Sequence, residues 1–368
     1  MASISAGNSI FDQLFQIIYL GSFLFFMVYG QKVQTWIMLR DIQGAVMRLR
    51  TMKDDARKIA IDVISKANDG KIDPTPRIDH FMEYFMIMPS NLDPGGIVPK
   101  IQHVVDVREQ RFKDEVKLLA PSVSEDIANN FEGVLSVALG LNTIYRVVNH
   151  FYLLGKKTMS IYVIMQIQMQ LPMIIQMAEA YSAAIKAFAE GQPIGDGAGA
   201  LVAAKMAHGN EFREIAKETV VYTVPFEGRT AYVLKSKGPG STVGKPGEAL
   251  KALIEEHAGE VKLVIMVDAA GKLEGEKSGG ISEGSGPVIG GLGVDQYLIE
   301  EISLKYKIPV HAVIIKESLE EAVSPMTKDI VEGVDVAVAR VRRLIHEGTS
   351  EGDKLIVAGI GNTCGIGQ

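Results

Sequence analysis

Apolar runs alternating with amphipathic segments over residues 191–368 are the feature that most restricts the fold of this chain. The runs "VKLVIMVDAAG", "IPVHAVIIK" and "DKLIVAGIG" are typical of strands buried on both faces, and helical patterns such as "VDQYLIEEISLKYK" lie between them. The segments "ETVVYTVPFEG" and "RTAYVLKSKG" predict two more strands, joined by a turn at Glu227-Gly228. We therefore expect an α/β domain with a mostly parallel sheet and helices on both of its faces.

The start of the chain predicts a membrane anchor. The segment from Leu14 to Val33 is apolar over about the 20 residues that cross a bilayer core, and no Lys or Arg precedes Lys32. Because basic residues follow closely, the positive-inside rule places the N-terminus outside and the remainder of the chain in the cytoplasm. The segment predicts a single-pass membrane protein bound to lipid; a buried or interfacial helix is the alternative.

Changes of pattern along the chain predict four parts. These are the transmembrane anchor over 1–34, a long helix over 35–72, a helical domain over 73–190 and the α/β domain over 191–368. The long helix carries an apolar stripe at steps of three and four, formed by Leu39, Ile42, Val46, Leu49, Met52, Ala56, Ile59 and Val63. This stripe fits a coiled coil that makes the protein a homo-oligomer, and it fits equally a helix packed on its own chain.

A Met- and Gln-rich stretch over 159–191 closes the helical domain. It is too polar for an easy second membrane span, and Met-rich helix faces are more often core or protein interface than cofactor site. The net charge of −6 argues against nucleic-acid binding, which favours clustered positive charge. The single Cys364 excludes an intramolecular disulfide framework and cysteine-rich zinc sites.

Polar residues at the ends of the predicted strands are the first candidates for a site. Ligands of open α/β sheets bind beyond the carboxyl ends of the strands. Asp268 and Glu317 end two predicted strands, His311 lies near the start of the second, and the last strand ends in Gly361-Asn362. We expect these carboxyl ends to meet at one edge of the sheet.

The final strand runs into a glycine turn, "LIVAGIGN", where a helix would normally follow. A helix that suits this turn begins after Asp196, in "PIGDGAGALVAAK", so that the last strand reads as if it belonged before residue 192. In that order the motifs resemble the hydrogenase-maturation and spore-germination protease superfamily, with Asp268 after the next buried strand and His311 by a later one. The resemblance implies a circularly permuted protease-like fold and a peptide or amide hydrolase.

The resemblance implies two forms of chemistry. In the hydrogenase-maturation branch two acids and a His hold a divalent metal, which here would be Zn, Ni or Fe bound by Asp196, Asp268 and His311. In the germination-protease branch acids alone act as general acid and base. Glu283, in the glycine-rich loop 271–293, is a third candidate catalytic acid beside Asp196 and Asp268.

The loop "SKGPGSTVGKPGEAL" lies before a predicted helix and is a candidate anion site. Backbone N–H groups at helix starts bind phosphate or carboxylate, and a tight structural turn is the alternative. Its candidate cofactor-binding residues are Gly240, Ser241, Thr242 and Lys245. Together with the N-terminal apolar segment, this loop resembles an archaeal family of membrane-anchored proteins of about this length, a resemblance that implies no activity.

Two functions follow from these patterns. The first is a membrane-anchored cytoplasmic hydrolase of proteins or peptides, which requires acids, or an acid and a His, around one water or metal. The second is a non-catalytic oligomeric scaffold or ligand-binding module, which predicts an exposed apolar face on the Met-rich helices.

Overall fold

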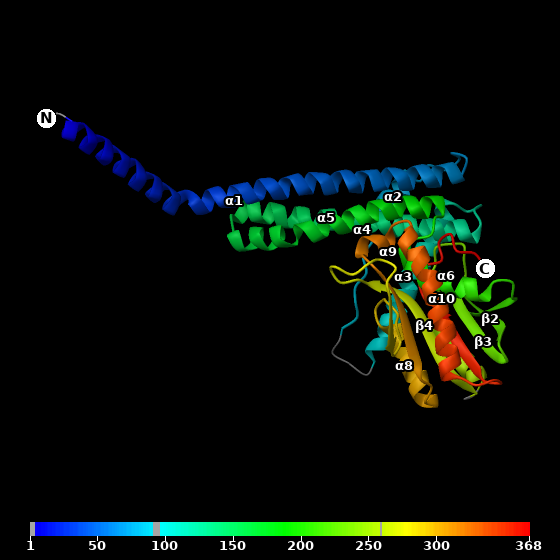
Figure 1. Cartoon of the computed structure of the whole chain (residues 1–368). Helices are drawn as coiled ribbons and strands as arrows, with labels where there is room; N and C mark the ends of the chain where they lie inside the picture. Colours follow the sequence, from blue (N-terminus) through cyan, green and yellow to red (C-terminus); the bar gives the residue numbers. More distant parts are fainter. Residues whose placement is uncertain (1–3, 91–95, 258–259) are drawn as a thin grey trace. The chain divides into compact units, whose positions relative to one another are not determined.

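The computed structural model describes residues 4–90, 96–257 and 260–368, and Figure 1 shows its helices and strands. The residues group into two compact units. The first comprises Met1–Thr51 with Thr143–Gln176, and the second comprises Met52–Asn142 with Met177–Gln368. The second unit contains the whole α/β domain.

The N-terminal half of the chain is helical, as predicted. Its helices are α1 (Ile4–Ala67), α2 (Thr75–Phe81), α3 (Ile97–Leu119), α4 (Glu125–Thr158) and α5 (Ile161–Glu190). Helix α2 has Pro74 at its N-cap and Pro76 in its first turn, where the missing N–H of proline costs no helical hydrogen bond. The proline- and glycine-containing breaks of the sequence are therefore helix boundaries.

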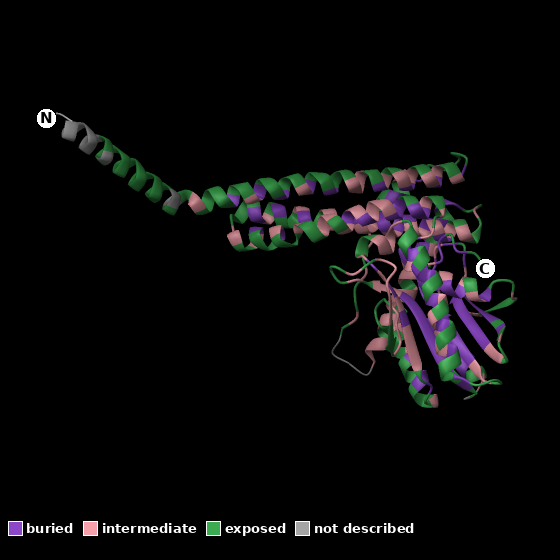
Figure 2. Cartoon of the chain, viewed as in Figure 1, coloured by how far each residue is buried: buried purple, intermediate pink, exposed green. Residues whose placement is uncertain are grey.

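Helix α1 continues without interruption from the predicted anchor into the predicted long helix. Five residues of the predicted apolar stripe are buried, because Leu39, Ile42, Val46, Leu49 and Ala56 are each at most 8% exposed. Its other members, Met52, Ile59 and Val63, are half-buried, and Ala60 and Ile64 are buried in their place. Burial of this stripe by the chain itself matches the packed-helix alternative. The exposed large apolar side chains of α1 lie mainly in its N-terminal part, which is drawn as exposed in Figure 2.

Three stretches of helix bear on the membrane prediction. Helices α4 and α5 are long and apolar enough to cross a bilayer by length and composition, with 44% and 22% of the apolar window buried. A third span is counted when Gln13–Phe25 and Tyr29–Ala67, which meet at a bend of 57°, are taken together. We expected the Gln residues of α5 to make it too polar for a membrane span, but the helix is apolar enough by length and composition. These helices are compatible with membrane association.

The α/β domain contains every strand that the sequence predicted. Its helices are η1, a single turn over Gly195–Gly197, then α6 (Ala198–Ala207), α7 (Pro246–Glu256), α8 (Val294–Tyr306), α9 (Leu319–Val323) and α10 (Lys328–Gly348). Its strands are β1 (Phe212–Ala216), β2 (Thr219–Phe226), β3 (Arg229–Ser236), β4 (Val261–Gly271), β5 (Ile281–Ser285), β6 (Val310–Glu317) and β7 (Lys354–Gly359).

Within the described residues these strands form one mixed sheet in the order β1-β2-β3-β7-β4-β6-β5. The four central strands are parallel, whereas β1, β2 and β5 pair antiparallel with their neighbours. The prediction of a mostly parallel sheet was therefore wrong. Two tight turns, at Lys217-Glu218 and Glu227-Gly228, join β1 to β2 and β2 to β3, and so short a connection allows only antiparallel pairing.

Helices cover both faces of the central sheet (Figure 1). In β4, Ile265 and Val267 pack in a core with α6 and α10, while the alternating Val264 and Met266 pack in a core with α7 and α8. All four side chains are fully buried. Burial on both faces explains why the sequence of this strand is continuously apolar.

The C-terminal strand β7 lies between β3 and β4 and ends beside the turn that opens α6. A Cβ at Gly359 would meet the backbone of Gly199, and one at Gly361 would meet the backbone of Asp196. Gly361 also has a φ of 124°, which favours glycine. The last strand thus lies next to residues 195–197, as the order of the motifs predicted.

Candidate functional site

Asp268 lies where the ladder between β4 and β7 ends. The last paired residues are Val267 and Gly359, and Asp268 follows at the next position of β4. Its side chain is 5% exposed, and its Oδ1 accepts a hydrogen bond from the backbone N–H of Ala269 at 2.8 Å. The carboxylate is therefore held at the carboxyl edge of the sheet, which is where ligands bind in such folds.

Asp196 reaches the same edge from the turn η1. Its Oδ2 accepts a hydrogen bond from the backbone N–H of Asn362 at 3.0 Å, just beyond the end of β7. This contact joins two segments that are 166 residues apart in the sequence. Asp196 as a whole residue is half-buried, whereas Asp268 is buried.

Glu317, the last residue of β6, completes a group that we call the acid cluster: Asp196, Asp268 and Glu317. Its side chain is 2% exposed, and its Oε2 has no hydrogen-bond partner. A Cβ at Gly195 would meet this oxygen, which places Glu317 directly against the turn that carries Asp196. Glycine at 195 is therefore required for the close approach of the two segments.

Among the described residues no cation forms an ion pair with the acid cluster. Desolvation first, and then the charge of Asp196, raise the pKa of Asp268 to about 8. Desolvation, followed by the charges of Asp196, Glu321 and Asp268, raises the pKa of Glu317 to about 8. Burial also raises the pKa of Asp196, against the effect of the Asn362 N–H group. Asp268 and Glu317 consequently hold their protons at neutral pH.

Asp196 and Asp268 line one cavity of about 440 Å³, which we call the strand-end cavity. Its size is in the range of small-ligand sites. Helix α3, the start of α7, residues 289–292 and the start of α8 also line it. Its aliphatic lining includes Met86, Val105, Val243, Ile289, Leu292 and Leu298, and its basic side chains are Arg108 and Lys245. The cavity thus combines Asp196 and Asp268 with an aliphatic wall, and three further acidic residues, Glu109, Glu248 and Asp295, also line it.

The predicted metal set of Asp196, Asp268 and His311 is not assembled. His311 is opposite Ile265 in the β4–β6 ladder, whereas Asp268 is opposite Ile314, so that roughly 10 Å of strand separates the two positions. Among the described residues no group of three or more His, Cys, Asp or Glu side chains could hold a metal ion. These residues do not fit the metal that the resemblance implies.

Glu283 does not join the acid cluster. It lies on the edge strand β5 and does not line the strand-end cavity. Its carboxylate instead pairs with Arg340 at 3.0 Å and Arg343 at 2.6 Å, both on α10. The sequence placed Glu283 in a long loop, and the loop turns back to form a strand, which directs this residue to the helix.

The predicted anion loop uses its donors within the protein. The backbone N–H of Ser241 donates to Asn130 at 2.9 Å, and the Thr242 hydroxyl donates to Glu218 at 2.8 Å. A Cβ at Gly240 would meet the backbone of Asp126. The start of α7 already receives a carboxylate, because the N–H of Gly247 donates to Asp295. These contacts match the alternative of a structural turn.

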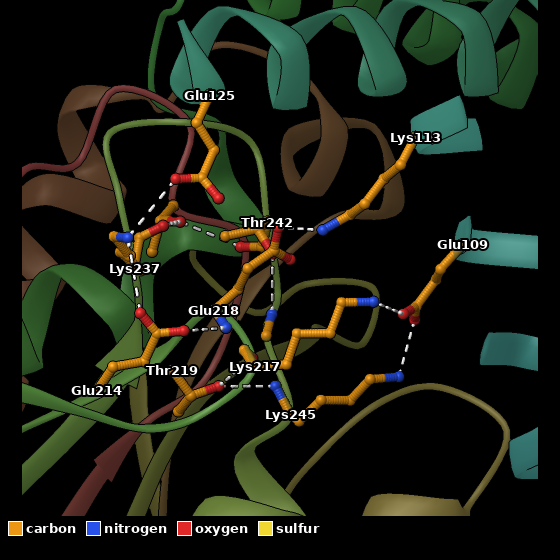
Figure 3. A network of polar contacts seen from close by, with 12 residues as sticks. Glu109, Lys113, Glu125, Glu214, Lys217, Glu218, Thr219, Lys237, Thr242 and Lys245 are labelled. Carbon is orange, nitrogen blue, oxygen red and sulfur yellow. Dashed lines mark hydrogen bonds and ion pairs between the residues drawn. The ribbon is translucent and has the colours of Figure 1, made fainter. Parts of the chain in front are cut away.

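Lys245, the fourth residue of that set, belongs to a group of ion pairs that we call the α3 clamp (Figure 3). Its Nζ lies 2.9 Å from Asp106 and 3.0 Å from Glu109, both on α3. The clamp also contains the pair of Lys113 with Glu218, and Lys217 at 3.7 Å from Glu109. The α3 clamp fixes the helix that lines one side of the strand-end cavity.

Sequence reasoning therefore selected two members of the acid cluster as catalytic residues, and it noted the third, Glu317, at a strand end without selecting it. Glu317 ends a predicted strand, so the same strand-end rule that selected Asp268 could have selected it. Arg108, which lines the cavity from α3, carried no signal of this kind. Its position depends on a contact between a helix and a sheet that are distant in the sequence.

Comparison with known proteins places the chain in a family. Residues 16–191 match the model described as Protein of unknown function (DUF1512) N-terminal domain, and residues 194–367 match Domain of unknown function (DUF1512) C-terminal. The boundary between the two matches, at residues 191–194, coincides with the end of α5 and the start of η1. No curated protein and no solved structure matches the chain. Together the two models extend over nearly the whole sequence, and the chain belongs to the DUF1512 family.

Proposed function

We propose that this protein is a membrane-anchored hydrolase of amide or peptide bonds in which Asp196 and Asp268 act as general base and general acid. The observation that carries the proposal is that both carboxylates line one cavity and that the pKa of Asp268 is raised to about 8. A carboxyl group that is protonated at neutral pH can donate a proton in the reaction. Two nearby carboxylates with separated pKa values are the arrangement that such chemistry needs.

The roles follow from the environments of the two acids. Burial raises the pKa of Asp196, but the Asn362 N–H opposes this shift, whereas the charge of Asp196 further raises the pKa of Asp268 and of Glu317, and we therefore assign Asp196 as the ionised member of the cluster. It accepts an N–H hydrogen bond from Asn362, and it lines the strand-end cavity. Asp268 is nearly buried and keeps its proton. Asp196 is therefore the base, and Asp268 the acid.

The reaction balances without a further reactant. Asp196 takes a proton from a water molecule as the water oxygen attacks the amide carbonyl carbon, and Asp268 gives its proton to the carbonyl oxygen. The tetrahedral diol then returns that proton to Asp268 as the carbonyl re-forms, and protonated Asp196 gives its proton to the leaving nitrogen. The C–N bond breaks, a carboxylic acid and an amine leave, and both side chains return to their starting states.

The order of the motifs supports this chemistry. The end of β7 lies next to the turn that carries Asp196, which is the juxtaposition expected of a permuted protease-like domain. The metal-free, acid-only form of the resemblance suits the acid cluster better than the metal form does, since His311 lies elsewhere. The parallel central strands β3, β7, β4 and β6 supply the edge that this site requires.

The N-terminal part of α1 is the proposed anchor. Its described apolar side chains are exposed, among them Phe15 at 72%, Ile17 at 67% and Tyr19 at 67%. A bilayer would cover such a surface. With the basic residues after Val33, a single span with its N-terminus outside and the α/β domain in the cytoplasm is the topology we propose.

Hydrolysis by the full chain in detergent tests the proposal. A defined peptide mixture is incubated in isotopically labelled water, and mass spectrometry detects the label in new carboxyl groups. We expect Asp196→Asn and Asp268→Asn each to lower the rate by about 100-fold or more. Glu283→Gln is the control, because Glu283 does not line the cavity. Unchanged rates in both Asp variants, or no label incorporation by the wild type, would refute the proposal.

A non-catalytic oligomeric scaffold is the second candidate, and one observation favours it. Helix α5 exposes large apolar side chains at helical spacing, with Tyr162 at 80%, Met169 at 78% and Met173 at 62%. Such a face suits a protein partner or a second copy of the chain. If Met169→Lys with Met173→Lys converts an oligomer into a monomer in detergent without changing hydrolysis, the scaffold and the hydrolase coexist.

A further inference from the structure

Arg108 lines the strand-end cavity and also a neighbouring cavity of about 260 Å³, which Ser136 and Phe112 line as well, and it has no counter-ion among the described residues. Its guanidinium donates to the Ser136 hydroxyl at 3.3 Å and lies 4.7 Å from the ring centre of Phe112. Among the described residues no carboxylate pairs with it. An arginine side chain offers five N–H donors in a planar fork that suits a carboxylate, and these contacts occupy few of them.

The other charged groups that line this cavity have partners. Lys245 pairs with Asp106 and Glu109 of the α3 clamp. Asp295 accepts the N–H of Gly247, and Glu248 accepts from the side-chain amide of Gln102 at 2.9 Å. Arg108 is thus the basic group in the cavity that is able to bind an incoming anion.

The remainder of the wall indicates what accompanies that anion. Val105 lies on α3 with Arg108, while Leu292 and Leu298 lie on the opposite segments, and all three line the cavity. Aliphatic side chains of this kind bind an apolar group by removing it from water. A volume of about 440 Å³ accommodates a ligand of a few residues.

We infer that Arg108 binds the free terminal carboxylate of an apolar peptide, so that the enzyme cleaves the amide bond near a peptide's C-terminus. This inference rests on the proposed function, because it assigns the substrate class of the same site. The geometry that carries it is an unpaired guanidinium and an aliphatic wall in one cavity with Asp196 and Asp268. Arg108 is then a specificity residue, and the two acids carry the chemistry.

Binding of three small probes to the full chain in detergent tests the inference. The probes are acetyl-leucyl-leucine, its C-terminal amide, and acetyl-aspartyl-leucinamide, which carries its carboxylate on a side chain. Calorimetry in the Asp268→Asn background measures affinity without turnover. We expect the free acid to bind about 10- to 100-fold more tightly than either amide, as a charge-assisted contact does.

Variants of α3 assign that preference to one residue. Arg108→Gln should abolish the preference for the free acid, and Arg108→Lys should retain part of it, since an ammonium keeps the charge and loses the fork. Lys117→Gln is the matched control, because Lys117 is an exposed basic residue of α3 that lies outside the cavity. A preference for the free acid that survives in Arg108→Gln would overturn the inference, as would equal binding of the acid and its amide.

The outcomes separate this inference from the proposed function. Hydrolysis that requires Asp268 but is unaffected by Arg108→Gln or by C-terminal amidation overturns the inference and leaves the hydrolase. Carboxylate binding that requires Arg108, with no hydrolysis of any probe by the wild type, overturns the hydrolase and leaves the carboxylate site. Tighter binding of acetyl-aspartyl-leucinamide than of the free acid overturns the terminal assignment.

Discussion

The acid cluster and the α3 clamp are both rich in carboxylates, but the two regions shift the pKa values of these groups in opposite directions. In the clamp, Glu218 accepts hydrogen bonds from Lys113 and Thr242. Although desolvation works against it, these contacts and the nearby charge of Lys113 and Lys217 lower the pKa of Glu218. In the acid cluster no cation from the described part of the chain pairs with the carboxyl groups, and the pKa of Asp268 is raised to about 8.

This difference shows what each region does for the protein. A paired carboxylate stays ionised and holds two elements together, here α3 and the turn between β1 and β2. An unpaired buried carboxyl group lowers stability at neutral pH, because burial disfavours its charged form. Groups of that kind are typical of sites that transfer protons. The two regions should therefore respond to pH and mutation with opposite signs.

The largest effect should be on the pH dependence of hydrolysis. Since Asp268 must carry a proton to act as the acid, we expect kcat/KM to fall about tenfold per pH unit above about 8. The fall on the acid side should follow protonation of Asp196. Initial rates of the full chain across the pH range measure this profile, and a rate that rises steadily above pH 8 would exclude Asp268 as the acid.

The protonation of Asp268 should also change the free energy of unfolding. In the folded state the pKa of Asp268 is raised from its ordinary value of 3.8 to about 8. The stability that the protonated side chain contributes is therefore complete below pH 3.8, and it is lost as the pH rises toward about 8. Asp268→Asn removes the titration and should stabilise the fold at pH 9 by up to about 5 kcal/mol, with little change at pH 4. Thermal unfolding followed by circular dichroism measures the difference.

Glu317→Gln is a second test of whether removing a buried carboxyl group stabilises the fold at high pH, because the pKa of Glu317 is also raised to about 8. Its Oε2 lacks a partner, so an amide at this position loses no hydrogen bond at that oxygen. If both substitutions destabilise the protein at pH 9, the description of the acid cluster as unpaired is wrong.

In the α3 clamp, removal of a carboxylate should destabilise the fold at neutral pH. Glu218→Gln leaves the ammonium of Lys113 without its charged partner, in a pair whose side chains are 19% and 16% exposed. We expect a loss of about 1.5–3 kcal/mol at pH 7. Because the pKa of Glu218 is lowered on folding, its contribution is present above the unfolded pKa and disappears as pH falls through the folded value. Glu332→Gln, in an exposed pair on α10, should change stability little.

The fold was predictable where strands are continuously apolar, and less so at the sheet edges. Strands β4 and β7 are buried on both faces and β6 is buried on one face and half-buried on the other, so their apolar sequences identify them. Strand β5, "ISEGS", is an edge strand with a polar, glycine-containing sequence, and only its pairing with β6 defines it. Treating its segment as a loop led to the mostly parallel sheet.

The candidate site, like the fold, was predictable only in part. Strand ends and the glycine turn identify Asp268 and Asp196, because parallel strands bring their carboxyl ends together. Register decides against His311, and it depends on how β6 aligns with β4 rather than on the residues of β6 alone. Lys245 is bound by Asp106 and Glu109, which are 139 and 136 residues away, so no local pattern reveals that its charge is already neutralised.

The smallest effect should come from the exposed margin of the clamp network. Lys237 lies 3.6 Å from both Glu125 and Glu214 (Figure 3), with side chains that are 35%, 67% and 51% exposed. Water screens such pairs, so Lys237→Gln should cost at most about 1 kcal/mol, and about 1 M salt should abolish the difference. The cost of Glu218→Gln should persist in the same salt, because that pair is largely shielded from solvent. Thermal unfolding of both variants at low and high salt distinguishes these cases: equal salt sensitivity would mean that burial does not separate the core of the clamp from its margin.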